Sequence, residues 1–263
     1  MKVVSVIGCG WLGLPLAMEL VRRGYTVKGS TRSDAKLKEL ERRGVSGFVL
    51  DLDEGVPPDP DLLDCDVLFL NVPPGRGSDV EQRYPARMET ALAGLSQSCE
   101  RVIFVSSTSV YPSCNARVSE SFVGEPDKIS GRALLAAEAL IDGGETDGVI
   151  LRMGGLIGPG RMPGNFLAGK TDVRQGDSPV NLLHQVDAIG VSLDAIEGRL
   201  SAGVYNVVCD DHPTRREYYT AAAKHLGVSV PSFADDTEAR WKVIDNAKIK
   251  AASGYRFRPL EVK

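Results

Sequence analysis

Met1-Lys2-Val3-Val4-Ser5-Val6-Ile7-Gly8-Cys9-Gly10-Trp11-Leu12-Gly13 is the stretch of this chain that decides its fold. It joins an apolar run to the pattern Gly-x-Gly-x-x-Gly, and residues 12–23 follow as a predicted helix that ends at Gly24. Glycines at this spacing permit a tight turn, bring backbone N–H groups against a pyrophosphate and let the helix pack closely on the strand. The N-terminal end of that helix carries a partial positive charge that favours the same anion. The stretch therefore predicts that a dinucleotide is bound by Gly8, Gly10, Trp11, Leu12 and Gly13. A glycine turn without a ligand is the alternative, and a second predicted strand at residues 25–29 disfavours it.

The rest of the chain alternates between apolar runs and amphipathic stretches. The apolar runs are mostly continuous Val, Ile, Leu and Phe, which indicates strands that are buried on both faces and therefore a parallel sheet covered by helices. We expect strands at residues 3–7, 26–29, 47–50, 67–71, 101–106, 148–152 and 204–208. Helices are expected between them at residues 34–43, 79–98, 130–141, 186–197 and 214–226. This alternation predicts an α/β protein with a Rossmann-type, doubly wound parallel sheet.

Two segments interrupt the alternation. Residues 154–180 are rich in Gly and Pro, and the tail from residue 210 carries helices of its own. Ligands of such sheets bind outside the carboxyl ends of the strands, where these segments emerge. We therefore expect a dinucleotide-binding domain at residues 1–153, completed by residues 186–208. Residues 154–185 and 209–263 would form a small discontinuous substrate-cap lobe.

Composition restricts the class of partner. The net charge is −4, with 31 basic and 35 acidic residues spread along the chain. That distribution offers no basic surface for a nucleic acid or an anionic membrane, so the expected partner is a small-molecule substrate. No apolar run approaches the roughly 20 residues of a membrane span, and the first strand begins too early for a signal peptide, so we expect a cytoplasmic protein. The five cysteines form no Cys-x-x-Cys pattern, so neither a disulfide framework nor a metal site is expected. We interpret them as buried apolar residues, with a redox-sensitive Cys9 as the alternative.

The end of the second predicted strand bears on the choice of cofactor. Proteins that bind NAD usually carry an acidic residue there for the ribose 2′-hydroxyl, whereas this chain has Ser30, Thr31 and Arg32. Hydroxyls and a guanidinium suit a 2′-phosphate, so NADP is preferred over NAD. In the other interpretation Arg32 is merely solvated and Asp34 takes the ribose. After the third strand, Asp51 and Leu52 are placed to flank an adenine, although a turn-forming Asp pair fits the same residues.

Four short motifs follow in a fixed order. They are Ser106-Ser107-Thr108-Ser109-Val110-Tyr111, Leu151-Arg152-Met153-Gly154-Gly155-Leu156-Ile157-Gly158-Pro159-Gly160, Val180-Asn181-Leu182-Leu183-His184-Gln185-Val186-Asp187 and Tyr205-Asn206-Val207. With these motifs the chain resembles, over nearly its whole length, the extended short-chain dehydrogenase/reductases, also called NAD-dependent epimerase/dehydratases. The resemblance implies that Ser107 hydrogen-bonds a substrate hydroxyl or carbonyl. It also implies that Asn71, Val72 and Pro73 line the cofactor groove. The helices at 79–98 and 130–141 stand where this family commonly forms homodimers, although the same faces would pack on the sheet of a monomer.

The chain departs from that family at its catalytic dyad. The Tyr-x-x-x-Lys pair should open the helix at 130–141, where Ser130 and Leu134 stand instead. None of the seven tyrosines is followed by a lysine four residues later. The dyad works because the ammonium lowers the tyrosine pKa from about 10, and neither serine nor leucine supplies this. The candidates for a replacement acid/base group are Tyr111 and His184, whose imidazole has an ordinary pKa of about 6.5. Lys128 and Lys170 are further candidates.

Two functions of different class follow from these residues. The first is an NAD(P)-dependent oxidoreductase, epimerase or dehydratase that acts on a sugar-like or other small carbonyl substrate with a non-standard acid/base group. Arg161, Asn165 and Lys170 would then hold a phosphate or carboxylate of the substrate. The alternative is a catalytically inactive, NADP(H)-binding sensor or regulatory protein, which the missing dyad favours. A Rossmann reductase that shares only the glycine motif is a third interpretation, and the order of the later motifs disfavours it.

Overall fold

The computed structural model describes residues 2–144, 146–235 and 240–261. Its centre is a seven-stranded parallel sheet with the strand order β10-β7-β5-β4-β1-β2-β3. Val4 of β1 pairs with Val27 of β2 on one side and with Val67 of β4 on the other. The order therefore reverses between β1 and β4, which is the switch point of a doubly wound sheet. The strands are β1 (Val3–Ile7), β2 (Thr26–Thr31), β3 (Ser46–Val49), β4 (Val67–Leu70), β5 (Arg101–Ser107), β7 (Asp147–Met153) and β10 (Gly203–Val207).

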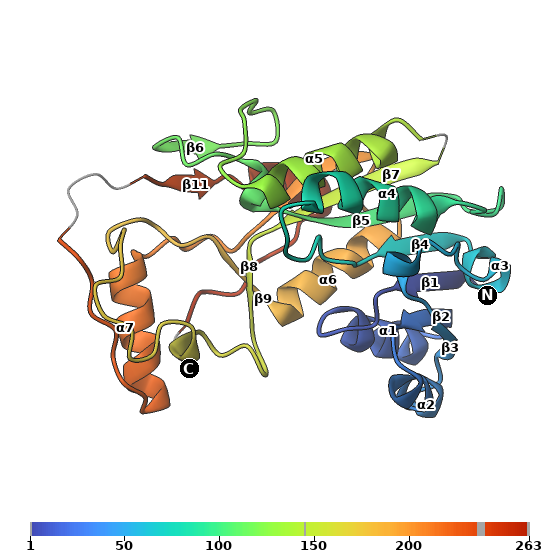
Figure 1. Cartoon of the computed structure of the whole chain (residues 1–263), viewed down its shortest axis with the longest axis horizontal. Coiled ribbons are helices and arrows are strands. Elements are labelled where there is room, and N and C mark those ends of the chain that lie inside the picture. Colours follow the sequence, from blue (N-terminus) through green and yellow to red (C-terminus); the bar gives the residue numbers. More distant parts are fainter. Residues whose placement is uncertain (1, 145, 236–239, 262–263) are drawn as a thin grey trace.

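Helices cover both faces of this sheet (Figure 1). On one face lie α1 (Gly13–Arg22), α2 (Asp34–Arg42) and α6 (Gln185–Ile196), and on the other α3 (Pro60–Leu63), α4 (Val80–Leu92) and α5 (Ile129–Asp142). Alternate strand residues enter opposite cores, as a pleated sheet requires: Phe69 packs with the first set, and Leu68 and Leu70 with the second. This two-sided burial confirms the predicted Rossmann-type α/β fold.

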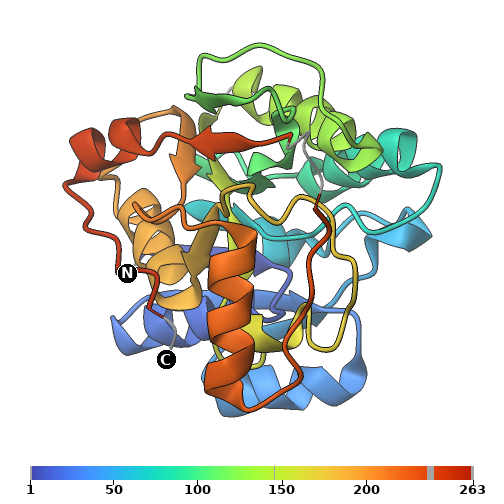
Figure 2. The same cartoon turned by 90° about the vertical axis from the view of Figure 1, so that its left-hand side faces the viewer.

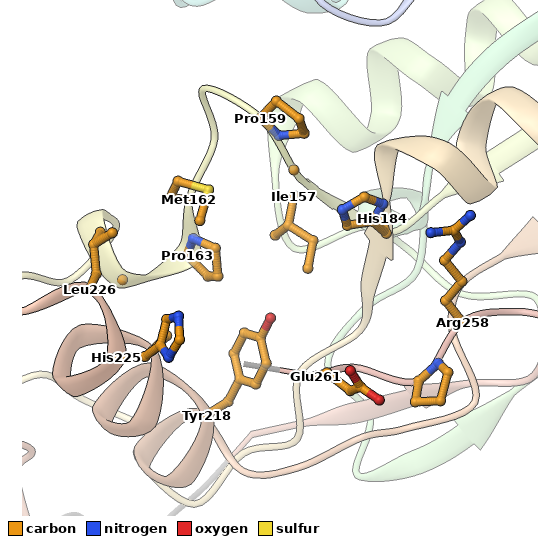
Figure 3. A pocket seen from close by; sticks show the side chains of 14 residues that line it. Ile157, Pro159, Met162, Pro163, His184, Tyr218, His225, Leu226, Arg258 and Glu261 are labelled. Carbon is orange, nitrogen blue, oxygen red and sulfur yellow. The ribbon is translucent and has the colours of Figure 1, made fainter. Parts of the chain in front are cut away.

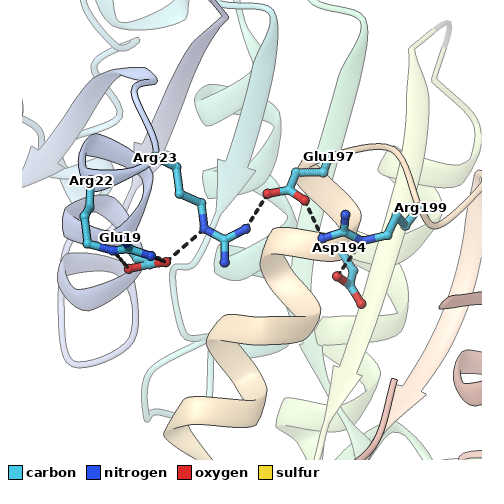
Figure 4. A network of polar contacts seen from close by, with 6 residues as sticks. All are labelled: Glu19, Arg22, Arg23, Asp194, Glu197 and Arg199. Carbon is cyan, nitrogen blue, oxygen red and sulfur yellow. Dashed lines mark hydrogen bonds and ion pairs between the residues drawn. The ribbon is translucent and has the colours of Figure 1, made fainter. Parts of the chain in front are cut away.

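The ends of α1 and α6 are joined by a chain of ion pairs (Figure 4). Arg23 donates to Glu19 of its own helix at 2.9 Å and to Glu197, just beyond α6, at 2.5 Å. Arg199 then pairs with Glu197 and, at 2.8 Å, with Asp194. These contacts tie two helices of the same face together far from the sheet edge where the glycine turn lies.

The segments that interrupt the alternation carry short strands and helices of their own. Within them, β8 (Gly155–Ile157) pairs in parallel with β9 (Leu182–His184), and α7 (Arg215–Leu226) packs on the 3-10 turn η3 (Pro163–Asn165). Figure 2 shows α7 standing at one end of the molecule. A second small sheet pairs β6 (Ala116–Val118) with β11 (Lys242–Ile244), so the tail returns to the body of the protein. After it, α8 (Ala247–Ser253) contributes Ile249 to the core under α1 and α6.

The structure corrects one predicted helix. The expected helix at residues 79–98 ends at Leu92, because Gly94 adopts a φ of +85° that does not continue a helix. In the segments where a homodimer face is expected, Leu92, Leu95 and Leu135 pack against the core of their own chain. Within the described ranges, no helix combines the length and apolar character needed to cross a membrane.

The five cysteines are free thiols, and burial raises the pKa of Cys9 to about 12, which keeps it protonated and unreactive.

Candidate functional site

The glycine-rich turn is built by close backbone contacts. Gly8 has a φ of +99°, and a Cβ on it would lie 2.4 Å from the Asn71 carbonyl oxygen. A Cβ on Gly13 would lie 2.3 Å from the Gly8 oxygen, so both positions require glycine. Gly10 is different, since nothing lies within 4 Å of its Cβ position among the described residues. The backbone is therefore open to a ligand at Gly10, and no described side chain caps the first turn of α1.

A groove of about 620 Å³ runs from this turn along the carboxyl ends of β1, β2, β3, β4 and β5. Twelve of the thirteen predicted cofactor residues line it, and Gly13 supports the turn from behind. The twelve are Gly8, Gly10, Trp11, Leu12, Ser30, Thr31, Arg32, Asp51, Leu52, Asn71, Val72 and Pro73. Parallel strands end at the same edge of a sheet, which explains why residues from four separate loops meet here.

Several of these side chains hold the groove itself in shape. The Ser30 hydroxyl accepts a hydrogen bond from the Gly8 N–H at 3.0 Å, and the Asn71 amide donates to the Gly8 oxygen at 3.1 Å. The Asp51 carboxylate accepts from the Asp53 N–H at 3.0 Å, so it forms a turn and also borders the groove. Ser30 and Asn71 therefore fix the position of the glycine turn that a pyrophosphate would meet.

Trp11 links the groove to the loop that follows β8. Its indole N–H donates to the Pro159 oxygen at 2.7 Å, and the Arg161 guanidinium lies 4.4 Å from its ring centre. The Gln185 amide donates to the Trp11 backbone oxygen at 2.7 Å. Stacking holds Arg161 beside the glycine turn, where its charge faces the same groove.

The lining of the groove is cationic. Four basic side chains and one carboxylate border it: Arg32, Lys36, Arg87, Arg161 and Asp51. Arg87 is buried, pairs with the Asp53 carboxylate and has an Nε without a hydrogen-bond partner among the described residues. An anionic ligand of the size and shape of a dinucleotide suits this charge pattern and the open backbone at Gly10.

Ser107 stands where the groove meets a second cavity. It lines both the groove and an adjoining cavity of about 300 Å³. Its hydroxyl oxygen accepts from the Ser109 N–H at 3.1 Å, which leaves the hydroxyl hydrogen available. The second cavity is also lined by Arg215, Tyr219 and Lys242. Leu134 is a buried part of the groove wall.

Lys242 reaches this cavity from β11. Its ammonium donates to the Tyr111 backbone oxygen, and burial lowers the pKa of the ammonium, with a smaller opposing effect from Asp127. The described lining of the cavity holds two cations, Lys242 and Arg215, and no carboxylate. The cavity therefore favours an anionic group on whatever occupies it.

The structure places Tyr111 away from both cavities. Its side chain is 2 % exposed, and its hydroxyl donates to Asn206 at 2.8 Å and accepts from Arg152 at 2.7 Å. Arg152 in turn is paired with the buried Glu138 carboxylate at 2.6 Å. Burial raises the pKa of Tyr111, and it lines neither the groove nor the Ser107 cavity in the described part of the chain. These contacts give the Tyr111 hydroxyl a structural role.

His184 lines a different cavity from Ser107. It lines a third cavity, between the loop after β8, α7 and the C-terminal segment (Figure 3). Its Nδ1 accepts from the Val186 N–H at 3.2 Å, which makes it the cap of α6. The three predicted catalytic residues therefore do not meet, and Ser107 alone borders the dinucleotide groove.

Sequence reasoning missed Lys36, Arg87 and Lys242. Lys36 stands three residues after Ser33, one turn into α2, so the helix period contained a signal for it. Arg87 and Lys242 gave no local signal, because α4 and β11 reach the site only through packing.

Comparison with known proteins agrees with this geometry. Residues 3–121 match the family model described as the NAD binding domain of 6-phosphogluconate dehydrogenase. The sheet order and the glycine turn define a Rossmann-type protein, and its N-terminal part is similar to an NAD-binding domain. The chain is 34% identical over 267 residues to Protein YeeZ of Escherichia coli strain K12, a match that covers 98% of this chain and 96% of YeeZ. The protein belongs to the YeeZ family.

Solved structures share the fold at lower identity. A functionally unknown conserved protein from Silicibacter pomeroyi has a TM-score of 0.81 at 21% identity, covering 100% of this chain and 95% of that one. MoeE5 in complex with UDP-glucuronic acid and NAD has a TM-score of 0.76 at 21% identity, covering 98% and 94%. UDP-glucose 4-epimerase from Bifidobacterium longum, in complex with NAD+ and UDP, has a TM-score of 0.76 at 16% identity, covering 99% and 95%. The resemblance to epimerases is thus confirmed at the level of the fold.

Proposed function

We propose that this protein is an NAD(P)-dependent oxidoreductase or epimerase/dehydratase-like enzyme that acts on a small carbonyl or sugar-like substrate bearing an anionic group. The observation that carries the proposal is the position of Ser107, which lines both the cationic groove and the cavity of Arg215 and Lys242. A substrate in that cavity would touch Ser107 beside the cofactor. The cap lobe that we expect from residues 154–185 and 209–263 would cover it.

The proposed cofactor is NADP in preference to NAD. Arg32 and Lys36 would hold the 2′-phosphate at the exposed end of the groove, and the N–H groups around Gly10 would hold the pyrophosphate. Arg161, fixed by its stacking on Trp11, would add a second charge beside the phosphates. Such a cofactor supplies hydride acceptance or donation when it is bound.

We assign proton handling in the absence of the dyad to Lys242. By the resemblance to the extended short-chain dehydrogenase/reductases, Leu134 would stand in place of the dyad lysine, and it provides neither charge nor hydrogen bonds. Lys242 lines the cavity together with Ser107, and burial moves the pKa of its ammonium toward the range in which it can exchange a proton with a substrate oxygen. Ser107 would orient that oxygen through its hydroxyl hydrogen.

The test combines binding with isotope transfer. The purified, cofactor-free protein is titrated with NADPH and NADH by calorimetry and by energy transfer from Trp11, which lines the groove. The protein is then added to cell extract with deuterium-labelled NADPH. Mass spectrometry follows transfer of the label to any metabolite, relative to extract without the added protein. Ser107→Ala and Lys242→Met should retain NADPH binding and lose transfer, whereas Lys224→Met, on the exposed side of α7, should keep both. The proposal would be overturned if the protein bound neither NADPH nor NADH.

A second candidate function rests on Leu134. Because this apolar side chain forms the groove wall where the extended short-chain dehydrogenase/reductases would place an ammonium, the protein would also suit a role as a catalytically inactive NADP(H) sensor. Binding of NADPH without label transfer to any metabolite would favour the sensor. Transfer that depends on Lys242 would exclude it.

A further inference from the structure

The third cavity is separate from the site of the proposed reaction. Its volume is about 680 Å³, and it lies between the loop after β8, one side of α7 and the C-terminal segment (Figure 3). Its described lining shares no residue with the groove or with the Ser107 cavity. Tyr218 of α7 faces this cavity, whereas the next residue, Tyr219, lines the Ser107 cavity. The two cavities thus lie on different sides of the same helix.

Tyr218 supplies a polar group that is unpaired in the part of the chain that the structure describes. The residue is 3 % exposed, and its hydroxyl has no hydrogen-bond partner among the described residues. Figure 3 shows the hydroxyl directed into the cavity. A buried hydroxyl without a partner is costly, and a bound acceptor would remove that cost. This feature distinguishes the cavity from a simple gap between elements.

Two further donors border the cavity from other elements. His184 accepts the Val186 N–H through Nδ1 at 3.2 Å, so the neutral ring carries its proton on Nε2. The Arg258 guanidinium contacts Asp187 through Nε at 3.9 Å, and among the described residues its terminal nitrogens have no closer acidic partner. Arg258 presents these nitrogens beside His184 (Figure 3). Phenol, imidazole and guanidinium are all donors, so the cavity is suited to an acceptor with negative charge.

The rest of the wall is mostly apolar, with the imidazole of His225 as a further polar group. Ile157, Met162, Pro163 and Leu226 form most of it, and Glu261 is its one described carboxylate. The Arg258 side chain is 61 % exposed, and a single guanidinium in a lining that also holds a carboxylate disfavours a ligand with several negative charges. A planar carboxylate matches the fork of a guanidinium, and the apolar wall matches a hydrocarbon or aromatic body.

We propose that this cavity is a binding site for a small monoanionic organic acid. The carboxylate would be held by Arg258, His184 and Tyr218, and its apolar body would pack on Ile157, Met162 and Leu226. This site goes beyond the proposed function, because it requires neither the dinucleotide nor Ser107. It borders Pro159, whose oxygen accepts the indole N–H of Trp11, so Trp11 emission can report its occupancy.

The experiment uses the full chain and simple probes. Benzoate, phenylacetate and hexanoate are titrated by calorimetry at concentrations up to the millimolar range, with benzamide as the neutral counterpart of benzoate. We expect the carboxylates to bind and benzamide to bind at least about tenfold more weakly, because it lacks the charge that Arg258 recognises. Tryptophan emission is followed in the same titrations.

Variants of the residues that line the cavity test where benzoate binds. Tyr218→Phe and Arg258→Gln should each weaken benzoate at least about tenfold, which corresponds to the loss of one hydrogen bond to a charged group. Lys224→Gln removes an exposed cation from the same helix and should leave the affinity unchanged, as should Ser107→Ala and saturation with NADPH. Circular dichroism verifies that each variant is folded. The proposal is overturned if the wild-type protein binds none of the acids, if benzamide binds equally well, or if neither Tyr218→Phe nor Arg258→Gln weakens binding.

Discussion

The buried hydroxyls of Tyr111 and Tyr218 predict opposite effects of the same substitution. Both side chains are at most 3 % exposed. The Tyr111 hydroxyl has two partners, Asn206 at 2.8 Å and Arg152 at 2.7 Å, whereas the Tyr218 hydroxyl has none among the described residues. Replacing each tyrosine by phenylalanine removes one oxygen and keeps the ring, so the difference between the two variants isolates the hydrogen bonds.

The size of the effect follows from these partners. Tyr111→Phe removes one neutral bond and one bond to a charged group, and it leaves the fully buried Asn206 amide oxygen without that donor. We expect the free energy of unfolding to fall by about 2–4 kcal/mol. Tyr218→Phe removes an unpaired buried hydroxyl, so the free energy of unfolding should stay the same or rise by up to about 2 kcal/mol.

Equilibrium urea unfolding measures both quantities. Circular dichroism and tryptophan fluorescence should give coincident transitions, with the midpoint lowered for Tyr111→Phe and unchanged or raised for Tyr218→Phe. NADPH affinity should be unaffected in both, because neither residue lines the groove. Equal stability of Tyr111→Phe and the wild-type protein would refute the structural role of Tyr111. A loss in Tyr218→Phe as large as that in Tyr111→Phe would show that the Tyr218 hydroxyl has a partner.

Three other predictions concern the groove and the surface network. Gly10→Ala should keep wild-type stability but weaken NADPH binding in calorimetry, because its Cβ enters the open groove. Gly13→Ala should lower the urea midpoint, because its Cβ would meet the Gly8 oxygen at 2.3 Å. The reverse pattern would contradict the assigned geometry. Arg32→Ser should weaken NADPH by about 10–100-fold and leave NADH nearly unchanged, and an equal loss for both nucleotides would argue against a 2′-phosphate site. Hydrogen bonds from Arg22 and Arg23 lower the pKa of Glu19 to about 2 from 4.5, so its stabilisation is complete above pH 4.5 and is lost as the pH falls through 2. The small stability difference between wild type and Glu19→Gln should therefore shrink over this range and with added salt, and a constant difference would count against the network.

The dinucleotide groove could be read from the sequence because its residues follow local patterns. Each lies at the end of an apolar strand, and parallel strands bring their carboxyl ends to one edge whatever the rest of the chain does. Gly8 and Gly13 could be read for the same reason, since the backbone contacts that require them are made within the turn or with the neighbouring strand. The helix at 79–98 was predicted too long because its apolar period continues past Gly94, where the backbone leaves the helix.

The positions of the acid/base candidates depend on long-range packing, so they were harder to predict from the sequence. Tyr111 lies four residues after Ser107, yet the chain turns there and directs its hydroxyl to Arg152 and Asn206. His184 caps α6 and faces a different cavity. Lys242 joins Ser107 because β11 pairs with β6, a contact between segments that are far apart in the sequence.

By itself, the sequence determined the parallel sheet, the glycine turn and the cationic end of the groove, because hydrophobic period and glycine spacing act over a few residues. Only the tertiary structure decided which polar side chains share a cavity. It placed Lys242 with Ser107, gave the Tyr111 hydroxyl two partners and, among the described residues, left that of Tyr218 unpaired. The physical reason is that the partners of a buried polar group are fixed by the packing of distant elements, and no local pattern of residues encodes that packing.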